Sequence, residues 1–150
     1  MRIPETKIAS LAFIVCLFGS SAATAQNINE TTYVKRDGPT VLVRTIEGQP
    51  KIVIRMIGPV DVVKVEPYID AKKGKKSGRL AFRVVLKNTS SEPRTYQVFG
   101  QGRTPTGGWE GGASKAPSKG KLDPGKETTA SFRTGFEGTS LPNEIRVDVF

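Results

Sequence analysis

Residues 80–87 read Leu-Ala-Phe-Arg-Val-Val-Leu-Lys, and this stretch decides the fold class. Leu80, Phe82, Val84 and Leu86 occupy every second position, which places them on one face of an extended strand. The intervening positions include two basic residues, so the opposite face suits solvent. Such alternation is typical of a strand in an antiparallel sheet that buries one face.

Similar patterns recur along the chain, separated by turns rich in Gly, Pro, Asn and Asp. No helical period is evident. We expect strands at residues 31–35, 40–46, 51–57, 60–66 (ended by Pro67), 80–87, 94–100 and 128–136, with a last strand through Ile145, Val147 and Val149. Regular short strands predict an all-β protein, a single antiparallel β-sandwich of about seven to eight strands.

The N-terminal residues 1–25 have the pattern of an export signal. Arg2 and Lys7 form a basic start, an apolar stretch follows, and small residues end at Ala25. The apolar stretch is too short to span a bilayer, so we expect cleavage after Ala25 and no transmembrane segment in the mature chain. The predicted division is a signal peptide at 1–25 and a folded domain at 26–150, located in the periplasm or secreted.

Composition narrows the chemistry of this domain. The chain has no histidine, and its one cysteine, Cys16, lies in the predicted signal. Histidine-based triads and zinc sites are therefore excluded, and we expect no metal, no cofactor and no catalysis.

Without residues 1–25, 21 basic and 13 acidic residues give a net charge of +8. In an envelope, the expected partners are a protein or an anionic component such as a glycan or lipopolysaccharide phosphate, and not nucleic acid.

One catalytic pattern deserves comparison. Ser118 and Lys121 fit the S-x-x-K spacing of serine penicillin-binding enzymes, and Arg133-Thr134-Gly135 resembles their K-T-G triad. That chemistry needs the serine at a helix start with the lysine one turn later, whereas Ser118 lies in a Pro- and Gly-rich stretch. A Ser-Lys hydrolase is the remotest of the hypotheses.

A basic turn is the first candidate binding feature. It consists of five cations, namely Lys72, Lys73, Lys75, Lys76 and Arg79. Such side chains on a turn can engage phosphate or carboxylate groups. The alternative is a solvated hairpin whose lysines keep neighbouring strand edges from aggregating.

The second candidate is the Gly-rich stretch from Gly100 to Lys121, which we expect to be a long loop. Its centre holds Trp109, the only tryptophan, between pairs of glycines, and Arg103 supplies nearby charge. An exposed Trp109 would anchor a partner. In the alternative interpretation, Trp109 folds back as a lid over the end of the sandwich.

The run from Leu80 to Pro93, followed by Leu-Asp-Pro-Gly-Lys at 122–126 and an alternating strand to Phe136, resembles bacterial immunoglobulin-like modules. An exported sandwich without cysteine is also loosely similar to curli-type amyloid chaperones. These resemblances imply partner binding more often than catalysis.

The leading hypothesis is an exported, non-catalytic binding module that uses the Gly/Trp loop and the basic turn. The alternative is a periplasmic inhibitor or holdase-type chaperone that acts through strand edges. The oligomeric state stays open.

Overall fold

The computed structural model describes residues 27–34 and 38–150, so the predicted signal peptide lies outside the described residues. The described residues form nine strands and no helix. The strands are β1 (Ile28–Val34), β2 (Thr40–Ile46), β3 (Lys51–Ile57), β4 (Val60–Ala71), β5 (Gly78–Asn88), β6 (Tyr96–Arg103), β7 (Trp109–Ala116), β8 (Glu127–Gly138) and β9 (Glu144–Val149). The all-β prediction is confirmed.

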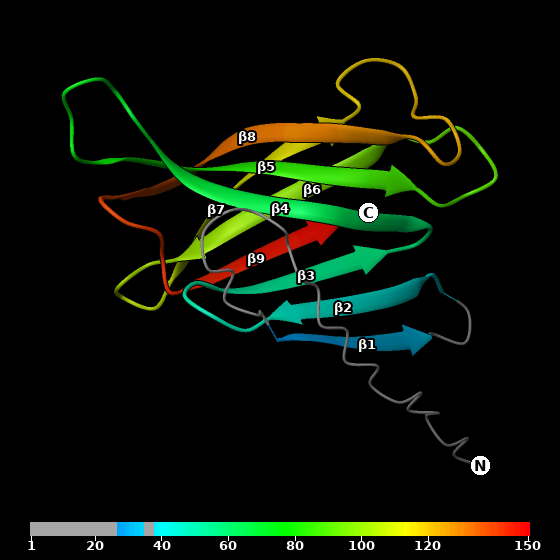
Figure 1. The fold of residues 1–150 in the computed structure, drawn as a ribbon, viewed down its shortest axis with the longest axis horizontal. Helices are drawn as coiled ribbons and strands as arrows, with labels where there is room; N and C mark the ends of the chain where they lie inside the picture. The colour runs from blue at the N-terminus through cyan, green and yellow to red at the C-terminus, as the bar shows by residue number, and fades with distance from the viewer. Residues whose placement is uncertain (1–26, 35–37) are drawn as a thin grey trace, which may run out of the picture.

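Two sheets of unequal size form the two layers of a sandwich (Figure 1). The six-stranded sheet has the order β1-β2-β3-β9-β6-β7, and the three-stranded sheet has the order β4-β5-β8. All pairs are antiparallel except β3 with β9, which run parallel from Lys51 beside Glu144 to Met56 beside Val149. The sandwich is therefore antiparallel, as predicted, except at this one pair of strands.

The order of the central strands has a known counterpart. In an immunoglobulin-type sandwich, strands A, B and E are neighbours in one sheet and strands C′, C and F are neighbours in the other. The order β4-β5-β8 corresponds to the first set, and the order β7-β6-β9 corresponds to the second. β3 lies beside β9, where strand G lies in that arrangement, but β3 comes from the N-terminal part of the chain. Membership of the immunoglobulin-like superfamily stays a prediction.

The core lies between the two sheets and follows the predicted alternation. Leu80, Phe82, Val84 and Leu86 of β5 are all fully buried. They belong to one core cluster with the inward-pointing residues of β3 and β9, which are Ile52, Ile54, Met56, Ile145, Val147 and Val149. Burial of apolar surface on this scale is the main driving force for folding.

Two expectations about local structure are wrong. The stretch Gly100–Lys121 is not a long loop, because β6 and β7 form a hairpin with Tyr96 paired to Ala116 and Arg103 paired to Trp109. β4 does not end at Pro67 but continues to Ala71. A proline is tolerated there because β4 is an edge strand, with a sheet partner only on the side of β5. On its other side, an edge strand needs no N–H for a sheet hydrogen bond.

A buried polar network closes the sandwich at the end of β5. The Asn88 side chain is fully buried, and its Nδ2 donates to the carbonyls of Glu92 and Leu122, both at 2.8 Å. Its Oδ1 accepts from the Ser90 N–H at 2.8 Å and lies 2.8 Å from the Tyr96 hydroxyl. Burial raises the pKa of Tyr96 despite the opposing effect of the Arg94 charge, so the hydroxyl keeps its proton as a donor.

We expect Asn88→Ala to lower the free energy of unfolding by about 2–4 kcal/mol, because it leaves several buried donors and acceptors without partners. Chemical denaturation measures the change. Asn143→Ala, at an exposed position, is the matched control and should have little effect. Equal stability of the two variants would contradict the role assigned to the network.

Candidate functional site

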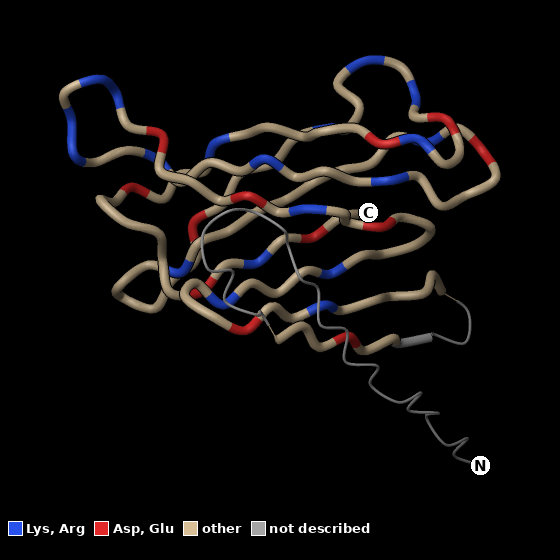
Figure 2. The backbone as a smooth tube through the Cα atoms, viewed as in Figure 1, with Lys and Arg blue, Asp and Glu red and all other residues tan. Residues whose placement is uncertain are grey.

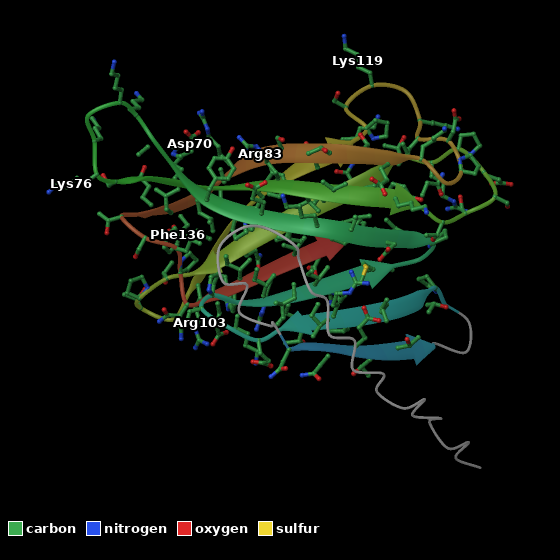
Figure 3. All side chains as sticks on the ribbon, in the orientation of Figure 1. Asp70, Lys76, Arg83, Arg103, Lys119 and Phe136 are labelled. Atoms are coloured by element: carbon green, nitrogen blue, oxygen red, sulfur yellow. The ribbon has the colours of Figure 1, made fainter. Side chains whose placement is uncertain are left out.

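The two predicted binding features lie at the same end of the sandwich. The β4–β5 turn carries the four lysines, and the β6–β7 hairpin carries Arg103 and Trp109. Figure 2 shows the basic residues of the turn at this end, and Figure 3 places Lys76, Phe136 and Arg103 there, while Lys119 lies at the opposite end. The fold therefore brings together residues that the sequence analysis treated as two separate features.

The basic turn connects β4 to β5 through an ordered reversal of the chain. The Lys75 N–H donates to the Lys72 carbonyl at 2.9 Å, and Gly74 has a φ of +82°, which favours glycine. The side chains of Lys72, Lys73, Lys75 and Lys76 are exposed. Within residues 27–34 and 38–150, no carboxylate forms an ion pair with any of these four lysines. Their charge is therefore available to a ligand.

Arg79 joins this turn to the opposite strand and differs from the lysines. It pairs across the sheet with Glu137 of β8, and its Nε lies 3.6 Å from Glu137 Oε1. Both side chains are well exposed, so the pair contributes little to stability. Arg79 is thus partly neutralised at the base of the turn.

Trp109 is the first residue of β7 and is partly buried on the outer face of the six-stranded sheet. The Arg146 guanidinium carbon lies 3.9 Å from the centroid of its ring, and that of Arg103 lies 6.0 Å away. Both distances suit cation–π attraction. Trp109 therefore neither caps the core as a lid nor extends freely from a loop. It is a platform for two guanidinium groups.

A shallow groove of about 570 Å³ lies at the same end of the sandwich (Figure 3). Arg103, which with Arg146 and Trp109 forms the Trp109 cluster, lines it, whereas none of the four lysines does. The end of β8, the β8–β9 connection and the β6–β7 turn form its walls, and Arg103, Phe136, Glu137 and Pro142 are among its lining residues. Phe136 is 6% exposed and contributes an apolar surface. At the rim, Arg103 Nη1 donates to Glu144 Oε1 at 2.9 Å. The groove thus combines an apolar patch with charged groups along its rim.

Two residues at this end, Arg146 and Phe136, were not predicted from the sequence as parts of the site. Arg146 alternates outward in the predicted last strand, but its contact with Trp109 depends on the order β9-β6-β7. Phe136 was expected only as a strand residue. In both cases the missing information is which distant strands become neighbours, and no local pattern carries it.

The candidate nucleophile lies elsewhere. Ser118 and Lys121 are exposed in the connection between β7 and β8, which contains no helical turn. Lys119, in the same connection, lies at the end of the molecule opposite the basic turn (Figure 3). The one-turn spacing that the Ser-Lys hypothesis needs is therefore not present at these residues.

In the described part of the chain, no three His, Cys, Asp or Glu side chains come together as a metal-binding group. None of the described residues forms a helix with the length and apolar character needed to cross a membrane. No protein-family model matches the chain, and comparisons with curated proteins and with solved structures give no significant match.

We expect Arg146→Ala to expose the ring of Trp109, shifting its emission to longer wavelength and making it more accessible to acrylamide. Stability should fall by only about 0.5–1 kcal/mol, the usual contribution of an exposed cation–π contact. Because Trp109 is the only tryptophan, intrinsic fluorescence reports on it alone. Arg55→Ala is the matched control, since Arg55 pairs with Asp148 on the same face. Identical quenching in both variants would contradict the platform geometry.

Proposed function

We propose that this protein is an exported, non-catalytic binding module that holds an anionic partner at the groove end of the sandwich. The partner is either a protein or an envelope component that carries phosphate or carboxylate groups. The observation that carries the proposal is that four lysines, which form no ion pair with a described carboxylate, lie at the same end of the sandwich as the Trp109 cluster and the groove that Arg103 lines (Figure 3). Export rests on the signal pattern of residues 1–25.

Each part of this end has a different role in the proposal. The lysines act as point charges that attract the partner over a distance of about one Debye length, roughly 8–10 Å in physiological salt. Arg103 and Arg146, held by Trp109, supply planar donors that suit carboxylate and phosphate geometry. Phe136 and Pro142 offer an apolar surface in the groove for the uncharged part of the ligand.

The groove, and not the number of lysines, distinguishes this end of the molecule from the other. Lys115, Lys119, Lys121 and Lys126 give a second group of four exposed lysines, located around the β7–β8 connection. None of these lysines lines the groove, and Lys119 lies at the opposite end of the molecule (Figure 3). They carry the same charge without the adjoining groove, so they provide an internal comparison.

We expect replacement of Lys72, Lys73, Lys75 and Lys76 by Gln to weaken binding to lipopolysaccharide micelles at least tenfold. A lysine near an anionic surface contributes about 1 kcal/mol, and tenfold corresponds to about 1.4 kcal/mol. Titration followed by Trp109 fluorescence at low and high ionic strength measures the affinity and its salt dependence. The matched control replaces Lys115, Lys119, Lys121 and Lys126 by Gln, which removes the same charge at the other end.

Equal loss of binding in the two lysine variants would mean that only net charge matters, and it would contradict a site at the groove. Absence of binding by the parent protein to micelles and to an acidic polysaccharide would remove the anionic envelope partner from the proposal.

A second candidate is the inhibitor or holdase that acts through strand edges. The outer edge of β1 is unpaired among the described strands, which is the observation that favours it. Because β1 is at the far edge of the six-stranded sheet from β7, a holdase that uses β1 would keep its activity after the lysines of the basic turn are replaced. The same lysine variant therefore separates the two candidates.

A further inference from the structure

The edges of the two sheets are protected to different degrees. An unpaired strand edge is a template for another strand, and natural proteins block such edges with proline, bulges, charges or covering segments. β4 is one edge of the three-stranded sheet, and Pro67 removes one N–H donor from it. A bulge between Val62 and Lys64 interrupts it further. Arg44 Nη1 donates to the Val62 carbonyl at 2.6 Å, so this part of the edge is already occupied.

The edges at β7 and β8 protect each other. β7 ends the six-stranded sheet and β8 ends the three-stranded sheet, and the two strands lie against one another. A Cβ atom at Gly112 of β7 would collide with the carbonyl oxygen of Arg133 of β8. Backbones this close leave no room for an additional strand on that side.

Among the described residues, β1 has none of these protections. It pairs with β2 along its whole length, from Ile28 beside Ile46 to Val34 beside Thr40, and no described strand lies on its other side. Its sequence, INETTYV, contains no proline, lysine or glycine. Its one charged residue, Glu30, forms an ion pair with Arg44 of β2. The outer edge of β1 is therefore a seven-residue template rich in residues that favour β structure.

We propose that β1 pairs antiparallel with β1 of a second copy of this chain, joining two six-stranded sheets into one continuous sheet across a two-fold axis. Self-pairing centred on Thr31 sets Thr31 opposite its own copy and Glu30 opposite Thr32. The remaining pairs are Ile28 with Val34 and Asn29 with Tyr33. No like charges face each other in this register, and β-branched residues occupy most of the pairs, which favours a stable sheet.

The charge distribution supports a second copy as the occupant. The protein as a whole is basic, but Glu30, the one charged residue within β1, is neutralised by Arg44, which also pairs with Asp61. Antiparallel pairing places the groove of one copy at the opposite end of the assembly from the groove of the other. The two basic turns are therefore kept apart, and repulsion between them opposes dimerisation little.

We expect the purified protein to sediment as a dimer, with twice the mass of the chain, at micromolar concentration. Thr31→Lys and Thr31→Glu should each be monomeric, because each sets like charges directly opposite one another at the two-fold axis. An equimolar mixture of the two variants should regain the dimer, since the opposed charges are then complementary. Thr129→Lys, which adds the same charge at an exposed position of β8, should stay dimeric.

A second measurement tests the register without depending on charge. In a Cys16→Ser background, Thr31→Cys should form a disulfide-linked dimer on mild oxidation, whereas Thr129→Cys should stay reduced. A parent protein that is monomeric at all concentrations, or a Thr31→Lys variant that remains dimeric, would overturn the proposal. Failure of the mixed variants to associate would overturn it as well. Capture of an extended foreign peptide at β1 without self-association would overturn the assignment to a second copy and favour the strand-edge chaperone.

Discussion

The packing of two phenylalanine rings against a glycine is the constraint on which the rest of the sandwich depends. Phe82 of β5 is fully buried and stacks on Phe132 of β8 with ring centroids 5.3 Å apart. A Cβ atom at Gly100 of β6 would lie 2.8 Å from the ring of Phe82 and 3.0 Å from that of Phe132. The two sheets reach their observed separation only because β6 has no side chain at this point. Gly102 is constrained in the same way, because a Cβ atom there would lie 2.7 Å from the Leu80 side chain and 2.9 Å from that of Pro142.

This packing also places the candidate site. The glycines hold β6 close to the three-stranded sheet, and β6 pairs on its two sides with β7 and β9. Trp109, Arg103 and Arg146 therefore meet on the outer face, while Pro142 and Phe136 are held at the end of the core. The basic turn arrives at the same end because β4 and β5 extend past the core as a long hairpin (Figure 1). Stability and the proposed binding site thus share one set of contacts.

The sequence predicts most strands because each buries one face, and that alternation is visible locally, as in Leu80 and Phe82. Strand β7 was not predicted because its glycines fit two different structures. Glycine is common in loops, and it is also required in a strand where another chain segment approaches closely. Gly112, which packs against the Arg133 backbone, carries no local sign of that contact. The parallel pairing of β3 with β9 and the Arg146–Trp109 contact join distant segments, so they depend on the strand order of the finished sheets. The basic turn was predictable because its five cations lie close together in the sequence, within residues 72–79.

The stability of Gly100→Ala, compared with Gly135→Ala, tests the account most directly. In a strand, replacing glycine by alanine usually stabilises by about 0.5–1 kcal/mol, and Gly135 has room for the added methyl group. At Gly100 the methyl group would press on both rings, so we expect a loss of about 1–3 kcal/mol, measured by chemical denaturation. The two substitutions should thus have opposite signs. A Gly100→Ala variant as stable as the parent protein would contradict the claim that these rings set the spacing of the sheets.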